Sequence, residues 1–280
     1  MCCLFLAASS TVAIAQTNVV DLVNPIIGTN GMGHTFPGAC VPFGLVQLSP
    51  DTDTIPHNVD GKYQPRSYEY CAGYQHKDSS IVGFSHTHFS GTGHSDLGDI
   101  LIMPTTGTLK LNPGTATNPD GGYRSRFSHD TEISRPGYYE VMLADYGVKA
   151  QLTTTQRAGI HKYTYPTNSE NQRIILDMIH GIYNYDGKVL WTNIRVENDT
   201  LVTGYRITNG WARTNYTYFA MSFSKPITHY GCEEKAKVDY RGGYAKFNMK
   251  ENFPDIGGRK IVAYFDFDPK MSDELEVKVA

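Results

Sequence analysis

Alternation of residues in steps of two, interrupted by turn signals, is the feature that most constrains this chain. Along residues 201–207 every second residue forms one face of a predicted strand, namely Leu201, Thr203, Tyr205 and Ile207. A period of two is the side-chain repeat of a β-strand. Residues 187–198 and 217–223 alternate in the same way on either side, and Leu190, Thr192 and Ile194 are predicted to share a face. With turns at 198–199 and 209–210, the three segments predict an antiparallel meander.

The same pattern recurs upstream, in residues 138–144, 147–155 and 159–165. Helix signals are scarce, whereas the chain holds 27 Gly, 14 Pro and 19 Tyr, a bias toward strands joined by turns. No low-complexity linker or internal repeat divides the sequence. It therefore predicts an all-β fold, a large antiparallel β-sandwich, built as one domain by residues 16–280.

The net charge excludes two classes of partner. The chain carries 25 Lys and Arg against 28 Asp and Glu, a formal net charge of −3. Proteins that bind nucleic acid or anionic membranes present a basic surface that attracts phosphate. We therefore expect no nucleic-acid partner, and no apolar run is long enough to predict a transmembrane span.

The first fifteen residues have the pattern of a secretory signal peptide. A short apolar run, residues 2–8, precedes the A-x-A cleavage site Ala13-Ile14-Ala15. Cleavage leaves three cysteines, Cys40, Cys71 and Cys232, and an odd number does not form a complete disulfide framework. The sequence predicts a secreted protein, or one in the periplasm or on the cell surface.

The last residues, DELEVKVA, again alternate like a strand up to Val279. Domains usually end in a turn, a cap or a polar tail. The pattern therefore predicts that the chain continues in the complete protein.

Residues 83–99, GFSHTHFSGTGHSDLGD, combine histidines, aspartates and hydroxyl side chains with glycines. On a strand His86 and His88 would share a face, and one zinc ion could bind both, with His94 or Asp96 as a third ligand. Zinc hydrolases with an H-x-H-x-D-H motif have Asp and His where this stretch has Ser and Gly. The match to such a zinc site therefore fails at two of its four ligands.

The same stretch fits neither a serine nucleophile nor a phosphate-binding loop. Ser90 lies in F-S-G-T-G rather than in a G-x-S-x-G turn, and no lysine follows Gly93 at the start of a helix. Two interpretations stay open from the residues alone. One is a Gly-rich loop that offers polar groups to a ligand, and the other is a structural loop whose histidines bond internally.

Two further segments place aromatic residues beside polar ones in glycine-containing turns. Residues 28–52 contain His34 and Phe36, and residues 68–88 contain Tyr70 and Cys71. An aromatic ring beside hydrogen-bonding groups is expected where a sugar ring stacks and its hydroxyls are recognised. The segments therefore predict a carbohydrate ligand.

Taken in order, these segments resemble the N-terminal domain of glycoside hydrolase family 92. The matching pieces are VNPIIGTNGMGHTFPGACVPFGLVQLSPDT from Val23, YCAGYQHKDSSIVGFSHTHFSGTGHSDLGDILIMPTTG from Tyr70, and TLVTGYRITNGWA from Thr200 through YFAMSFSKPI. The resemblance implies a sandwich of the supersandwich, galactose-mutarotase-like kind. It also implies that this domain precedes a C-terminal (α/α)6 domain in the complete protein.

Members of the family are mostly exo-acting, inverting, calcium-dependent α-mannosidases. The resemblance therefore implies hydrolysis of terminal mannose from mannosides and N-glycans by the complete protein. The C-terminal domain would supply the catalytic carboxylates and most Ca²⁺ ligands. No catalytic residue is therefore expected in this chain, and the chain alone is expected to be inactive. Its own metal ligands stay unassigned. Glu69, Asp96 and Asp99 are not predicted to be catalytic carboxylates. Asp99 is predicted to form hydrogen bonds at the end of a strand.

By the same resemblance, seven residues are predicted to contact sugar by stacking and hydroxyl recognition: His34, Phe36, Tyr70, Cys71, His86, His88 and Ser90. The family often has tryptophan in place of Tyr70, so this ring offers less area for stacking. Two alternatives stay open. One is a stand-alone carbohydrate-binding module, and the other is a metal-dependent hydrolase that uses His86, His88 and His94.

Overall fold

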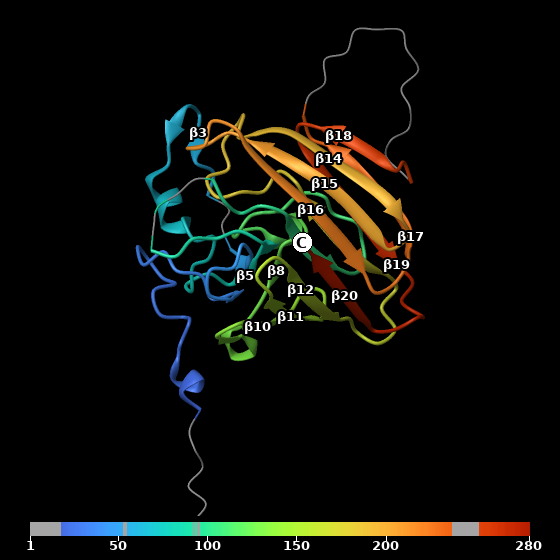
Figure 1. Ribbon diagram of the computed structural model, residues 1–280, viewed down its shortest axis with the longest axis horizontal. Coiled ribbons are helices and arrows are strands. Elements are labelled where there is room, and N and C mark those ends of the chain that lie inside the picture. Colours follow the sequence, from blue (N-terminus) through green and yellow to red (C-terminus); the bar gives the residue numbers. More distant parts are fainter. Residues whose placement is uncertain (1–17, 53–54, 92, 94–95, 237–251) are drawn as a thin grey trace, which may run out of the picture.

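The computed structural model describes residues 18–52, 55–91, 93, 96–236 and 252–280 (Figure 1). Nearly all of its regular structure is β, and most strands belong to two large antiparallel sheets. The predicted all-β fold and large antiparallel sandwich are thus confirmed. The predicted signal peptide, residues 1–15, and His94 lie outside the described residues.

The first sheet has seven strands in the order β1-β2-β6-β7-β13-β19-β17. They are β1 (Ala39–Cys40), β2 (Gln47–Asp51), β6 (Gly83–Ser85), β7 (Leu101–Thr105), β13 (Gln172–Asp177), β19 (Ile261–Phe267) and β17 (Ile227–Glu234). β7 and β13 are buried along their whole length, as expected at the centre of a covered sheet.

The second sheet has nine strands in the order β18-β14-β15-β16-β20-β12-β11-β10-β9. They are β18 (Asp255–Gly258), β14 (Val189–Asn198), β15 (Leu201–Thr208), β16 (Asn215–Phe223), β20 (Glu274–Val279), β12 (Gly159–Thr164), β11 (Val148–Thr154), β10 (Tyr138–Leu143) and β9 (Ile133–Arg135). The predicted meander is β14-β15-β16, and the three upstream segments are β10, β11 and β12.

The remaining elements are short. They are the strands β3 (Asn58–Val59), β4 (Lys62–Tyr63), β5 (Ser80–Ile81) and β8 (Ser125–Arg126), and the 3₁₀ helices η1 (Val19–Leu22), η2 (Pro65–Tyr70), η3 (Pro119–Gly121) and η4 (His129–Thr131). None of the helices in the described ranges has the length and apolar content needed to cross a lipid bilayer.

The two sheets face each other across one continuous apolar core. Phe223 of β16 packs against Phe267 of β19 with ring centroids 4.9 Å apart, and Phe84 of β6 lies 6.4 Å from Tyr163 of β12. Alternating burial in β20, where every second residue from Leu275 is buried, shows the pattern that brings these faces together. Each fully buried apolar side chain contributes about 1.5–3 kcal/mol by leaving water.

One predicted face is wrong. Leu190 does not share the buried face of Thr192 and Ile194 but is 39% exposed, whereas Val189 is buried. The register between β14 and β15 shifts between Val189 and Trp191. An extra residue in one strand reverses the side-chain alternation beyond it, which is what a β-bulge does.

Candidate functional site

Long connections gather at one end of the sandwich, beside the seven-stranded sheet. They are residues 24–38, 64–79, the described part of 86–98, and 178–188, and Figure 1 shows the blue and cyan segments together at the left of the strands. Backbone hydrogen bonds join them: Ile182 donates to Leu97 (2.8 Å) and His76 donates to Thr29 (2.9 Å). Most of the sequence-predicted residues lie on these connections.

His34 lies in the first connection with a backbone that few residues adopt, at φ +51°. It is 7% exposed, and its ring meets Tyr68 edge to face, with centroids 5.0 Å apart. Its Nε2 atom is buried and finds no hydrogen-bond partner among the described residues. Such an atom costs free energy until a ligand or water satisfies it. Strained backbone and an unsatisfied polar group together are typical of binding sites.

Phe36 and His88 lie together, with ring centroids 5.3 Å apart and Phe36 half-buried. His88 Nδ1 faces the backbone carbonyl of Gln47 (2.8 Å) and Nε2 faces Asp51 (2.9 Å), an arrangement that suits a ring donating from both nitrogens. His180 Nε2 donates to the second oxygen of Asp51 (2.9 Å). Burial by itself would raise the pKa of the Asp51 carboxyl, but His88 and His180 outweigh it and the pKa lies well below its usual range.

Tyr70 and Cys71 are buried beneath these loops, at 5% and 1% exposure. The Tyr70 hydroxyl donates to Asp78 (2.8 Å), and Cys71 Sγ lies 2.8 Å from the hydroxyl of Tyr183. Tyr183 itself has a φ of +51°. The two predicted residues therefore connect loop segments to one another in this structure.

His86 points between the sheets. Its Nδ1 donates to the Ile100 carbonyl (2.6 Å), and its Nε2 lies 3.0 Å from Nε2 of His161 on β12. The hydroxyl of Tyr163 donates to the other nitrogen of His161 (2.8 Å). Burial lowers the pKa of His86 to about 4 and lowers that of His161 well below its usual value. The two imidazoles therefore form a neutral, internally bonded pair in the core.

The predicted strand face shared by His86 and His88 is wrong, because β6 ends at Ser85 and the two rings turn to different partners. Neither histidine belongs to a cluster of three candidate metal ligands in the described part of the chain. The hydrogen bonds of His86 and His88 match the interpretation of a structural loop, in which histidines hydrogen-bond to other residues of the chain.

Ser90 is exposed in the loop after β6. The backbone N–H of the next residue, Gly91, donates to the carbonyl of His34. Gly93 packs against Tyr68 so closely that a Cβ atom there would lie 2.3 Å from the tyrosine hydroxyl, so a larger residue would displace the ring. The fold thus brings Ser90, His34 and Tyr68 together. We refer to His34, Phe36, Tyr68 and Ser90 as the loop-end site.

An aromatic cluster beside the loop-end site was not predicted from the sequence. Tyr68 stacks on Tyr183 at 6.4 Å, and the His57 ring lies 5.0 to 5.5 Å from those of Tyr63, Tyr183 and Tyr185. A signal for it was present in residues 180–185, HGIYNY, which place tyrosines at alternate positions directly after a buried strand.

The carboxylates of this region are engaged by internal donors. Asp96 accepts the backbone N–H groups of residues 211 and 212 at 2.8 and 2.9 Å. Asp99 pairs with Arg206 at 2.6 Å, which confirms its predicted bonding role at the start of β7, and Glu69 pairs with Lys77.

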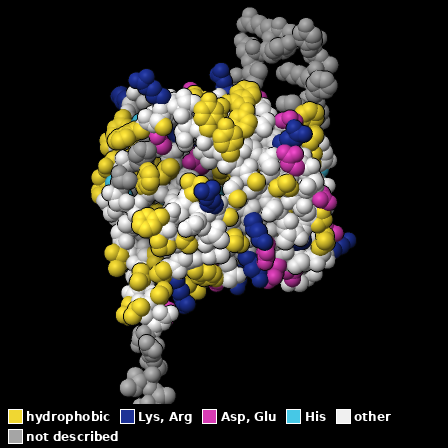
Figure 2. Space-filling model, in the orientation of Figure 1, with side chains coloured by type: hydrophobic (Ala, Val, Ile, Leu, Met, Phe, Trp, Pro, Cys, Tyr) yellow, Lys and Arg dark blue, Asp and Glu magenta, His cyan; other side chains and the backbone are white. Residues whose placement is uncertain are grey.

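A cavity of about 470 Å³ opens between the loop after β6 and the ends of β16 and β20. Its lining includes Leu97, Tyr216, Tyr218 and Ala280, and the two tyrosines are 55% and 69% exposed. Ala280 lies near the middle of the face seen in Figure 1, and Figure 2 shows hydrophobic side chains around that position. Two exposed aromatic side chains thus border this cavity.

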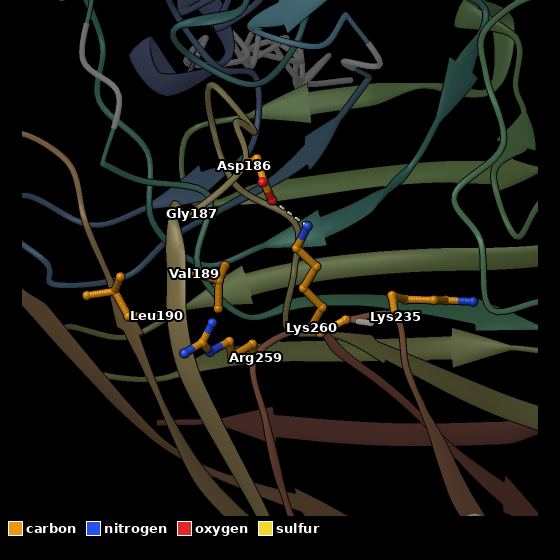
Figure 3. Close-up of a pocket in the computed structure, with 8 residues that line it drawn as sticks. Asp186, Gly187, Val189, Leu190, Lys235, Arg259 and Lys260 are labelled. Carbon is orange, nitrogen blue, oxygen red and sulfur yellow. Dashed lines mark hydrogen bonds and ion pairs between the residues drawn. The ribbon is translucent and has the colours of Figure 1, made fainter. Parts of the chain in front are cut away.

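A second cavity, of about 720 Å³, lies between the start of β14 and the turn from β18 to β19. None of the predicted residues lines it. Lys260 reaches Asp186 (2.7 Å), whereas the side chains of Lys235 and Arg259 point apart, as Figure 3 shows. Because the three cations do not converge on one point, this cavity lacks the geometry of an anion-binding site.

Comparison with protein families gives one match over most of the chain. Residues 22–280 match the family model described as the glycosyl hydrolase family 92 N-terminal domain. Among curated proteins, an uncharacterized secreted glycosidase from Arthroderma benhamiae is 29% identical over 170 residues, which is 58% of this chain and 19% of that protein.

Two solved structures from Bacteroides thetaiotaomicron are similar over nearly the whole chain. A family GH92 α-mannosidase in complex with mannoimidazole is 41% identical, with a TM-score of 0.80 over 94% of this chain. A family GH92 inverting mannosidase is 26% identical, with a TM-score of 0.67 over 93% of this chain. This chain spans only 32% and 31% of those two chains.

Proposed function

This chain belongs to glycosyl hydrolase family 92, as its N-terminal domain, and we propose that it is the carbohydrate-contacting domain of an exo-acting, inverting, calcium-dependent α-mannosidase. The complete enzyme would hydrolyse terminal mannose from mannosides and N-glycans. The 41% identity to a mannosidase that binds mannoimidazole supports this assignment of substrate class.

The observation that carries the proposal is the unsatisfied Nε2 of His34 next to the exposed ring of Tyr68. Tyr68 is 37% exposed, enough for a sugar face to stack on it. A hydroxyl of the same sugar would donate to or accept from the His34 nitrogen, which restores the hydrogen bond that the buried atom lacks.

The burial of the seven predicted residues suggests a division of roles. His34, Phe36 and Ser90 lie at the loop-end site and are proposed to contact mannose directly. Tyr70, Cys71, His86 and His88 are each at most 5% exposed and bond to other residues of the chain. We propose that these four act mainly by holding the loops in position, so their contact with sugar stays a prediction.

Calcium would help to bind and distort the sugar in the complete enzyme. A calcium ion takes six to eight oxygen ligands. Asp51, Asp96 and Asp99 at this end are occupied by imidazole, backbone amide and guanidinium donors, so these three carboxylates do not form a calcium shell. We therefore propose that most calcium ligands and the catalytic carboxylates come from the part of the enzyme that follows this domain.

The cavity beside Ala280 is the proposed contact surface for that C-terminal domain. Apolar and aromatic side chains line it together with polar ones such as Asp99 and Arg157, and similar enzymes are about three times as long as this chain. Tyr216 and Tyr218 stack at 6.4 Å and would pack against the partner domain.

Export is proposed on two grounds: the signal pattern of residues 1–15 and the similarity to a secreted glycosidase. The mature protein would then act in the periplasm, on the cell surface or outside the cell.

The test is an α-mannosidase assay on the full-length product of the source gene, compared with a His34→Asn variant. Asparagine tolerates the left-handed backbone at this position, so the substitution removes the imidazole with little strain. We expect kcat/KM for a terminal α-mannoside to fall about tenfold or more, with β-mannose released by the wild type and activity lost on chelation. Mannose binding without hydrolysis would instead support a binding module.

A further inference from the structure

Outside the loop-end site, His76, His129 and Glu132 bring two imidazoles and a carboxylate together. One donor atom of each residue lies within 4.8 Å of those of the other two. The two imidazole rings have centroids 4.0 Å apart and are tilted by 33°. His129 and Glu132 come from one 3₁₀ turn, and His76 comes from the segment between η2 and β5.

The carboxylate of this cluster is held in place by buried donors. Glu132 has a side chain only 3% exposed. Its Oε1 accepts the hydroxyls of Tyr74 (2.9 Å) and Tyr139 (2.6 Å), while Oε2 lies 2.6 Å from Nδ1 of His129. Both tyrosine hydroxyls therefore donate to the same carboxylate oxygen and fix its orientation. Metal-binding carboxylates are usually oriented by such hydrogen bonds.

Among the described residues Glu132 pairs with a histidine and not with a lysine or an arginine. This partner is His129, and a histidine is charged only when protonated. Buried charges in proteins are usually paired or coordinate a metal ion. The two imidazole rings lie side by side at the carboxylate, with centroids 4.0 Å apart. A divalent cation bound between them would contact the carboxylate and both rings at once.

We propose that His76, His129 and Glu132 bind one zinc ion. Two imidazoles and a carboxylate form a donor set suited to Zn²⁺. A tetrahedral zinc with bonds of about 2.0–2.1 Å needs donor atoms roughly 3.4 Å apart, so small rotations of the rings complete the site. The His129 side chain is 38% exposed, which gives the ion an entry path and leaves water as the fourth ligand.

Bound zinc would stabilise the 24–38 connection, which carries His34 and Phe36 of the loop-end site. The backbone of His76 donates to Thr29 (2.9 Å), and the neighbouring Gln75 side chain exchanges two hydrogen bonds with Gly31, at 2.7 and 2.9 Å. These contacts hold the start of the segment that carries His34. The proposed role of the metal is therefore to stabilise the 24–38 connection, and no chemical step is assigned to it.

The test is a calorimetric titration of the metal-free chain with ZnCl₂ near neutral pH, with thiols blocked by alkylation because Cys40 is exposed. We expect about one zinc per chain, and a Kd raised at least about tenfold in His76→Gln and His129→Gln. His229→Gln is the matched control. Its side chain is also 38% exposed and also faces a carboxylate, Asp266, but it lies on β17.

Replacement of zinc by Co²⁺ on the unmodified sequence gives a readout that needs no variant. Four-coordinate cobalt with imidazole ligands absorbs visible light far more strongly than hydrated cobalt. Strong absorption that excess zinc removes supports the site. Weak absorption, no stoichiometric zinc, or equal zinc affinity in the His129 and His229 variants would overturn the proposal.

Discussion

Asp99 and Arg206 form an ion pair buried between the two sheets. Nη2 of Arg206 lies 2.6 Å from Oδ1 of Asp99, and the side chains are 0% and 2% exposed respectively. Arg206 belongs to β15 of the nine-stranded sheet, and Asp99 ends the loop that enters β7 of the other. The pair therefore fastens the loop that carries Ser90 to the opposite sheet.

Loss of the negative charge from this pair should destabilise the fold. Asp99→Asn leaves the Arg206 guanidinium buried without a counter-charge, and we expect a loss of about 3–5 kcal/mol in the free energy of unfolding. Lys162→Met, which breaks an exposed pair with Glu274 (40% and 53% exposed), is the control and should cost at most about 1 kcal/mol. Urea unfolding measures both, and equal losses would contradict the prediction.

Gly73 is predicted to be indispensable next to Asp51. Its φ is +79°, and a Cβ atom there would lie 1.9 Å from Oδ1 of Asp51 and 3.1 Å from Nε2 of His88. Gly73→Ala should therefore displace the carboxylate that both histidines share. Gly61→Ala is the matched control, because Gly61 has a similar φ of +76° but no atom within 4 Å of the added Cβ.

We expect Gly61→Ala to cost about 1–2 kcal/mol from backbone strain alone. Gly73→Ala should cost at least about 2 kcal/mol more, because a steric clash and a disturbed buried charge add to the strain. The difference between the two variants in urea unfolding isolates the clash. Equal costs would mean that Asp51 and His88 move aside freely.

The alternating segments made most of the sandwich predictable, since a period of two survives in β10, β11, β12, β15, β16 and β20. The bulge in β14 was not predictable from the sequence. A register shift depends on the partner strand and does not change the local alternation of residue types. Buried charges were missed for a related reason. Alternation places Arg206 on the face opposite Tyr205 and Ile207 but does not show that this face is buried, and its partner Asp99 lies 107 positions away.

The sequence was enough to predict which segments form the candidate site. It was not enough to predict which side chains of those segments point outward or contact one another. Their glycine-rich surroundings predict His34, Phe36 and Ser90 as ligand contacts, whereas the sequence pattern favours Tyr70 over Tyr68. The irregular connections between β1 and β7 have no periodicity that would show which ring points outward. Contacts such as that of His180 with Asp51, 129 positions apart, arise only from the folded sheet.

Acid should weaken the fold through His86 and His161. Both are buried and their pKa values are lowered by burial, that of His86 to about 4, against about 6.5 in an unfolded chain. Between these pH values the two histidines bind protons in the unfolded chain but not in the folded chain. The free energy of unfolding is therefore highest above about pH 6.5 and falls as the pH drops toward 4. For His86 alone the change is on the order of 3 kcal/mol.

Urea unfolding at about pH 7.5, 6 and 4.5 measures this dependence. His161→Gln cannot bind a proton in either state, so its stability should vary less across the window even if it is lower at pH 7.5. His229→Gln, which changes a half-exposed histidine on β17, should keep the wild-type slope. A His161→Gln profile as steep as the wild type would show that other groups cause the acid sensitivity.

Thiol reactivity should separate the three cysteines of the described residues. None of the three forms a disulfide with another described cysteine, and Cys40 is exposed whereas Cys71 and Cys232 are buried. Burial raises the pKa of Cys232 to about 11, so roughly one thiol in a thousand is ionised at pH 8, and only the thiolate reacts. Alkylation of the native chain, followed by mass spectrometry, should modify Cys40 first, and Cys71 and Cys232 only after denaturation.

The aromatic ring of Tyr68, rather than its hydroxyl, is predicted to contribute to the proposed activity by stacking on the sugar. In the full-length enzyme Tyr68→Phe keeps the ring and should retain kcat/KM within about threefold. Tyr68→Ala removes the ring face and should lower kcat/KM about tenfold, the effect of roughly 1.4 kcal/mol of lost stacking. Tyr230→Ala, on β17 of the seven-stranded sheet, controls for loss of a partly buried tyrosine. Equal losses in the Phe and Ala variants would assign the effect to the hydroxyl that Gly93 packs against, and no loss in either would remove Tyr68 from the sugar site.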